Sequence, residues 1–231
     1  MKKSGYIILS IILLSFTAIN VSAQGQSRTV SHFNAVVSAG PFNVHIKING
    51  NESVKVDADA DVINDIETVV EGSTLKIRFK DREYRHHNIH KAEVYVEARS
   101  LDELTNAGSG SIKVDGTIIS DRFKAILTGS GNITTAIKAD DLQAVISGSG
   151  SIKLSGSAGD ANVVVTGSGE IEGKDLKANA VTATITGSGN IYIKADKSVT
   201  GRITGSGSVI YSGNASVTSH TTGSGRVSKE D

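Results

Sequence analysis

Seven copies of Gly-Ser-Gly, spaced 18 to 21 residues apart, fill the second half of this 231-residue chain. They begin at Gly108, Gly129, Gly148, Gly167, Gly187, Gly205 and Gly223. A near-constant period of this length indicates an architecture in which each repeat forms one coil and neighbouring coils stack. Glycine permits a sharp bend and lets backbones approach closely. The period therefore predicts an all-β solenoid with a Gly-Ser-Gly corner in each coil.

The residues before each motif form columns of similar side chains. Two positions before the first glycine stand Leu127, Ile146, Val165, Ile185, Ile203 and Thr221, and six before it stand Phe123, Leu142, Ala161, Val181, Val199 and Val217. These positions share one face of a strand, because side chains alternate with period two. We expect this face inside. A second short strand follows each motif, and a polar turn such as 138–141 should end the coil. Asn-Gly hairpin turns are absent from the repeats, which favours parallel stacking.

Residues 24–105 lack the motif but alternate as strands do, for example over 42–48 and 75–79. We interpret 24–105 as an N-terminal β segment, either irregular early coils or a small sheet that covers the first coil. Residues 106–231 form the repeat solenoid. The stretch from 61 to 70 fits either a short helix or an irregular crossing.

The first 23 residues have the form of a signal peptide, with Lys2 and Lys3 before an apolar run and Val21-Ser22-Ala23 before the expected cut. The apolar run is shorter than the roughly 20 residues of a membrane span. The mature chain would carry 22 basic and 24 acidic residues and no cysteine. This balance gives no electrostatic reason to expect a nucleic-acid partner. We expect an exported protein with no transmembrane segment after cleavage.

The chain resembles the bacterial family described as "putative auto-transporter adhesin, head GIN domain". The resemblance rests on 129–133 and 187–191 (both Gly-Ser-Gly-Asn-Ile), on five variant copies, and on 33–36 and 40–44. It implies a right-handed parallel β-helix-like fold and a place in the envelope of Gram-negative bacteria, Bacteroidetes in particular, in the periplasm or at the cell surface. The family offers no catalytic residues. An autotransporter also needs a membrane-barrel translocator, and the chain stops six residues after its last motif, so we do not expect self-transport.

Three short motifs suggest chemistry but fit solvated segments better. Three histidines between 84 and 90 have no clear completing carboxylate for a metal. The acidic run 57–61 lacks the Gly and Glu that a twelve-residue calcium loop requires, since Val62 and Thr68 stand there. The stretch 167–174 is followed by Asp175, where a phosphate loop needs Ser or Thr. We therefore predict no metal and no cofactor.

Aspartates in the turns between coils raise an enzymatic alternative. They are Asp121, Asp140, Asp141, Asp160, Asp175 and Asp196. Clustered carboxylates of this kind serve polysaccharide-active β-helices, but aspartate is also an ordinary turn residue. Their offsets from the next motif are uneven and aromatic residues are few. We therefore expect a non-enzymatic binding or structural protein, with a polysaccharide-active enzyme as the alternative.

The candidate binding surface is the outward side of the strand that precedes each motif. Its predicted residues are Ile126, Val145, Val164 and Thr184, flanked by Thr128, Thr166 and Thr186. Contiguous exposed apolar residues often mark interaction sites. The partner would be a protein, a glycan or a second copy of the chain. The N-terminal segment could instead cover this face, and the threonine ladder also has a weak likeness to ice-binding solenoids.

Overall fold

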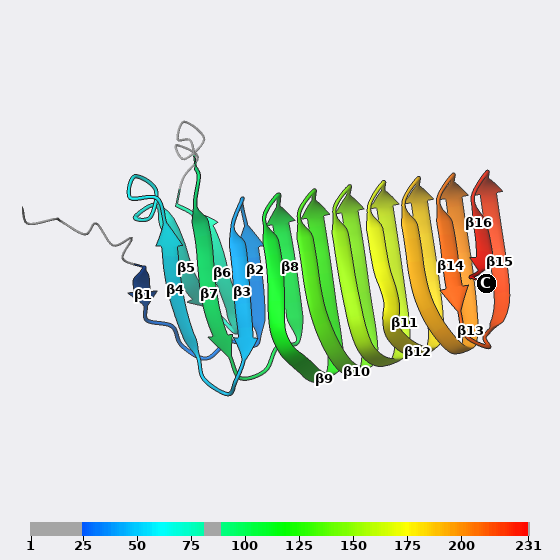
Figure 1. Cartoon of the computed structure of the whole chain (residues 1–231), viewed down its shortest axis with the longest axis horizontal. Helices are drawn as coiled ribbons and strands as arrows, with labels where there is room; N and C mark the ends of the chain where they lie inside the picture. The colour runs from blue at the N-terminus through cyan, green and yellow to red at the C-terminus, as the bar shows by residue number, and fades with distance from the viewer. Residues whose placement is uncertain (1–24, 81–88, 231) are drawn as a thin grey trace, which may run out of the picture.

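The computed structural model describes residues 25–80 and 89–230, and the signal-peptide prediction lies outside them. Over these ranges the chain is all-β, without a helix, and forms a β-solenoid of about seven turns. Figure 1 shows the coils stacked side by side along the long axis, with the N-terminal strands at one end and the C-terminus at the other. The predicted fold class is confirmed.

Sixteen strands make up the described part, and the long ones each hold both sides of a coil. The N-terminal strands are β1 (Gln26–Arg28), β2 (Ala35–Ala39), β3 (Asn43–Ile48), β4 (Ser53–Ala58), β5 (Ile66–Glu71), β6 (Thr74–Phe79), β7 (Ala92–Ala98) and β8 (Glu103–Gly108). The repeat strands are β9 (Ser111–Gly129), β10 (Asn132–Gly148), β11 (Ser151–Gly167), β12 (Glu170–Gly187), β13 (Asn190–Gly205), β14 (Ser208–Ser212), β15 (Ser216–Gly223) and β16 (Arg226–Lys229). All pairings among β8 to β16 are parallel.

Each Gly-Ser-Gly motif breaks the strand at one edge of the coil, as expected. The opposite edge differs from the expectation. The predicted polar turn at 138–141 lies inside the continuous strand β10, which bends while its pairing with β11 runs on either side of the bend. Register shifts between Thr134 and Ala136 and between Lys153 and Ser155 take up the differences in coil length. A bend with local irregularities therefore replaces a separate turn.

The two glycines of a motif are required for different reasons. Gly148, the first glycine of its motif, has a φ of +137°, and a Cβ there would lie 2.2 Å from the carbonyl oxygen of Gly129 in the previous coil. Gly150, the third residue, has no positive φ, but a Cβ would lie 2.7 Å from Leu127 Cδ2. Real Cβ atoms do not approach so closely, so the corner needs glycine at both positions.

The interior is filled by the predicted columns. Leu127, Ile146, Val165, Ile185 and Ile203 are all buried. Parallel pairing in exact register places each member of a column on its equivalent in the next coil. At the C-terminal end the second column, that of Phe123 and Leu142, opens, since its last member, Val217 in β15, is 40% exposed.

The N-terminal strands continue the solenoid end-on. Strand β2 pairs in parallel with β8, and β3 pairs in parallel with β9. Antiparallel pairing occurs farther out, between β1 and β4, β4 and β7, and β5 and β6. The predicted helical alternative for 61–70 is wrong: residues 60–65 form turns that bury Val62 and Ile63, and β5 follows.

Candidate functional site

The pre-corner face is the outward side of the strands that lead into the corners. Its predicted row Ile126, Val145, Val164 and Thr184 lies in register across β9 to β12. All four side chains are half-buried, between the buried columns on one side and solvent on the other. The neighbouring row of Thr128, Ser147, Thr166 and Thr186 is exposed. The structure thus brings the predicted residues together as two adjacent rows on one sheet.

The same row extends two strands beyond the predicted residues, first to β8, which leads into the first motif at Gly108, and then to β2. Thr105 of β8 pairs with Ile126, and Val37 of β2 pairs with Thr105. The sequence held a signal for this extension. Gly40-Pro41-Phe42 occupies the corner position in the coil that precedes the first motif. Two hydrogen bonds show this: Gly110 N donates to Gly40 O, and Ser111 N donates to Phe42 O. Counting three residues back from Gly40, as for the other motifs, gives Val37.

Charge is confined to the margins of this row. From Val37 to Thr184 the row holds only valine, isoleucine and threonine. Lys76 follows in register on β6, and Arg202 and His220 follow on β13 and β15. The described N-terminal strands extend the pre-corner face and leave Ile126, Val145 and Val164 half-exposed. In the described part of the chain, the N-terminal segment does not cover this face.

The turn aspartates do not gather into one cluster. Asp141 and Asp160 are register partners on β10 and β11, and with Arg122 they border a groove of about 490 Å³. The lining of this groove holds no tyrosine, and its phenylalanine, Phe123, is buried. Asp196 instead forms an ion pair with Lys177 at 3.0 Å. Two carboxylates beside an arginine, without an exposed aromatic ring, lack the sugar-stacking surface that a glycan-active cleft uses.

The acidic run at 57–61 makes structural contacts. Asp59 Oδ2 accepts hydrogen bonds from the backbone N–H groups of His90, at 2.7 Å, and Lys91, at 3.0 Å. These bonds, that of Lys91 foremost, lower the pKa of Asp59 below its usual value. Asp57 pairs with Lys91 Nζ at 2.7 Å. Residues 25–80 and 89–230 contain no group of three or more His, Cys, Asp or Glu side chains that could hold a metal; His86 and His87 lie outside the described residues.

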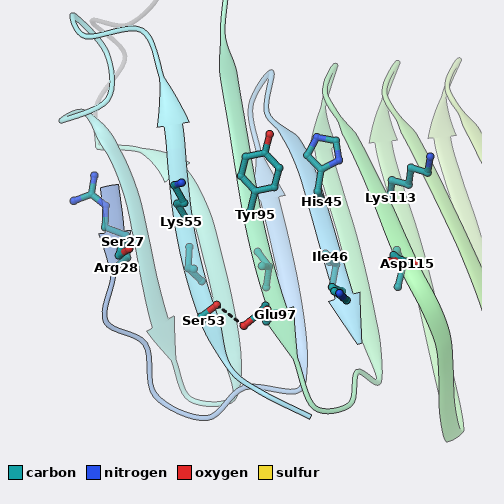
Figure 2. A pocket seen from close by; sticks show the side chains of 14 residues that line it. Ser27, Arg28, His45, Ile46, Ser53, Lys55, Tyr95, Glu97, Lys113 and Asp115 are labelled. Atoms are coloured by element: carbon teal, nitrogen blue, oxygen red, sulfur yellow. Dashed lines mark hydrogen bonds between the residues drawn. The ribbon is translucent and has the colours of Figure 1, made fainter. Parts of the chain in front are cut away.

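A second surface, which sequence reasoning missed, lies on the outward side of β1, β4, β7, β3 and β9. Here a groove of about 750 Å³ is open to solvent. Figure 2 shows Tyr95 of β7 and His45 of β3 side by side in it, with Lys55 and Lys113 beyond them on β4 and β9. The Tyr95 and His45 rings stack, with centroids 5.1 Å apart and planes at 18°. We call this surface the Tyr95 groove.

Comparison with known proteins identifies the family. The description "Putative auto-transporter adhesin, head GIN domain" matches residues 32–215, which is most of the chain. The chain belongs to this family. No curated protein matches it.

Solved structures of similar proteins share the fold. A "putative adhesin" from Bacteroides fragilis has 24% sequence identity and a TM-score of 0.84, covering 90% of this chain and 96% of its own. A "putative adhesin" from Parabacteroides merdae has 21% identity and a TM-score of 0.74, covering 92% and 98%. A "Putative lipid binding protein" from Parabacteroides distasonis has 24% identity and a TM-score of 0.71, also covering 92% and 98%. At these identities the likeness establishes the fold.

The family description and these names fit a non-catalytic binding role. Among the residues that the structure describes, no helix has the length and apolarity needed to cross a membrane.

Proposed function

We propose that this chain is an exported, adhesin-like binding protein of a Gram-negative cell envelope, in the periplasm or at the cell surface. In this proposal residues 1–23 are removed on export. Residues 24–105 begin the solenoid, and 106–231 extend it by regular repeats. The pre-corner face binds a protein or glycan partner or a second copy of the chain. The names of the solved relatives support a binding role, and the leader-like N-terminus supports export.

The observation that carries this proposal is the uncharged row from Val37 to Thr184 across six register-paired strands. Its β-branched side chains have few rotamers. They therefore lose little conformational entropy when a partner packs on them. Backbone pairing on both sides fixes each strand of the row. A flat, rigid, partly apolar surface of this kind is suited to binding, because the entropic cost of association is small.

The alternative is a polysaccharide-active enzyme that uses Asp141 and Asp160. Their neighbouring positions on β10 and β11 and the nearby Arg122 favour it. Hydrolysis of any member of a glycan panel by the purified chain, lost in Asp141→Asn or Asp160→Asn, would establish this alternative. We expect no hydrolysis.

Export is tested by fractionating cells that express the full chain and by treating intact cells with protease. We expect a product lacking residues 1–23 in the envelope fraction. Protease access distinguishes the cell surface from the periplasm. An uncleaved chain in the cytoplasmic fraction would contradict the proposal.

Binding is tested with microspheres coated with the purified mature chain. The probes are mucin, fibronectin, type I collagen and a layer of the chain itself. Val145→Lys with Val164→Lys should abolish adhesion, because two charges would have to be desolvated at the contact. Asn132→Lys with Asn190→Lys adds the same charge to the opposite side of the solenoid and serves as the control.

A milder pair, Val145→Thr with Val164→Thr, keeps the side-chain shape if the lysine pair disturbs folding. Adhesion that is equal in wild type, the valine variants and the control would refute the role of the pre-corner face. Absence of adhesion to every probe would contradict the adhesin-like function itself.

A further inference from the structure

The Tyr95 groove contains a row of four outward side chains on four neighbouring strands. Lys55 pairs in register with Tyr95, Tyr95 with His45, and His45 with Lys113. At the usual strand spacing, this row spans about 14 Å from the first Cα to the last. Two aromatic rings therefore stand between two ammonium groups (Figure 2).

A chain of hydrogen bonds fixes the ring platform before any ligand arrives. His45 Nε2 donates to Glu93 Oε2 at 2.5 Å, and Asn43 Nδ2 donates to Glu93 Oε1 at 2.9 Å. Ser111 Oγ donates to Asn43 Oδ1 at 2.9 Å. The histidine ring is thus held in place, and Tyr95 stacks on it while 44% exposed. An exposed aromatic side chain held in one orientation is preorganised to bind a flat ligand surface.

The charged side chains of the groove differ in whether they already have partners within the protein. Lys55 and Lys113 are exposed, and neither has an ion pair in the described part of the chain. The adjacent row places Lys47 in register between Glu97 and Asp115. Glu97 already accepts hydrogen bonds from Asn49 Nδ2 at 2.9 Å and Ser53 Oγ at 3.0 Å. The aromatic row thus carries unpaired positive charge, and the row beside it offers carboxylate acceptors.

We propose that the Tyr95 groove binds an acidic oligosaccharide, of the class that contains hexuronate rings. The apolar face of one sugar ring packs on Tyr95, as C–H groups do on aromatic rings. Sugar carboxylates at either side form charge-assisted hydrogen bonds with Lys55 and Lys113. Sugar hydroxyls donate to Glu97 and Asp115, because ionised carboxylates only accept. These acceptors distinguish an acidic sugar from a DNA strand, whose backbone offers phosphates and no row of free hydroxyl donors.

The Tyr95 groove lies apart from the pre-corner face, so an experiment can refute binding at one of these sites without refuting binding at the other. We expect Val145→Lys with Val164→Lys to leave acidic oligosaccharide binding unchanged. The binding of acidic oligosaccharides by the Tyr95 groove is therefore tested independently of the pre-corner face.

Isothermal titration of the folded mature chain is the direct test. The acidic probes are trigalacturonate and a hyaluronan hexasaccharide; the matched neutral probe is maltohexaose. Polyglutamate and a dT oligonucleotide are polyanions without acidic sugars. We expect an acidic oligosaccharide to bind at least roughly tenfold more tightly than the neutral sugar and the two polyanions.

Variants separate stacking from charge. Tyr95→Ala should weaken binding by roughly tenfold or more, and Tyr95→Phe should keep most of it, since the ring face remains. Lys55→Ala with Lys113→Ala should remove the preference for acidic over neutral sugars. Tyr192→Ala is the matched control, because Tyr192 stands in the same register row four coils beyond Lys113, outside the groove.

Three results would overturn the proposal. They are the absence of binding by both acidic oligosaccharides, binding of polyglutamate or dT as tight as that of the sugars, and equal effects of Tyr95→Ala and Tyr192→Ala. Circular dichroism and the unfolding midpoint of each variant confirm that the loss is local.

Discussion

Gly150 and Leu127 touch across adjacent coils, so closely that a Cβ on Gly150 would lie 2.7 Å from Leu127 Cδ2. The same relation recurs between Gly169 and Ile146 and between Gly189 and Val165. Each corner thus has its third residue packed on the buried side chain of the coil before it. The motif and the apolar column are one packing unit, which explains why they repeat together.

Gly150→Ala should destabilise the chain by about 3 kcal/mol, because the added methyl also meets the carbonyl oxygen of Gly131 and the core cannot yield without strain. Ser149→Ala, at the exposed middle of the same corner, should change stability by less than about 0.5 kcal/mol. Urea unfolding measures both. Equal midpoints for the two variants would show that the corner relaxes more freely than its packing suggests.

Alanine substitutions at two neighbouring positions on β10 should differ sharply in how much stability they cost. Ile146 is fully buried in the column, whereas Val145 points outward and is half-buried. Ile146→Ala should cost about 3 to 4 kcal/mol through lost burial and the cavity left behind. Val145→Ala should cost less than about 1 kcal/mol. Denaturant midpoints of the two variants test the assignment of the faces, and similar losses would contradict it.

The Asp59 carboxylate should stabilise the fold at neutral pH and less in acid. Its folded pKa is lowered by the backbone N–H groups of Lys91 and His90, so it binds its proton less readily folded than unfolded. The stabilisation is present above the ordinary value of 3.8 and disappears as the pH falls through the lowered pKa.

Asp59→Ala should therefore have a lower urea midpoint than wild type at about pH 7, and the gap should narrow towards about pH 3. Asp121→Ala, which removes an exposed carboxylate in the repeat part, controls for the general effect of charge. A gap that stays constant with pH would contradict the role of the ionised carboxylate.

The repeat half could be predicted from sequence because its order is local and periodic. Period-two alternation gives the faces, and the constant 19-residue spacing of Leu127, Ile146 and Val165 places them on one another. The bend inside β10 could not be predicted, since polar residues that continue a pairing look the same in sequence as those that end it. The Tyr95 groove was missed because β7 and β3 pair across about fifty residues without a repeat to mark their register.

Asn106, at the start of the repeat solenoid, is another residue whose place could not be predicted from the sequence. It pairs with Leu127 and stands in the buried column, where the next five coils have the apolar residues Leu127, Ile146, Val165, Ile185 and Ile203. Its Nδ2 donates to Gly110 O at 2.7 Å and, more weakly, to Asn132 O at 3.3 Å. Its Oδ1 is buried and has no hydrogen-bond partner in the described structure. A buried acceptor without a partner costs about 1 to 3 kcal/mol.

Asn106→Leu should consequently stabilise the chain by about 1 kcal/mol, because it extends the Leu127 column and removes the unpaired acceptor. Gly110 O loses one donor but keeps the backbone N–H of Asn132, at 3.1 Å. Asn106→Ala should instead destabilise by about 1 kcal/mol or more, since it leaves a cavity without filling it. Thermal and urea unfolding compare the two variants with wild type. If Asn106→Leu destabilises as much as Asn106→Ala, the Asn106 bond to the first corner outweighs its buried oxygen, and the residue sets the register in which the first repeat coil stacks.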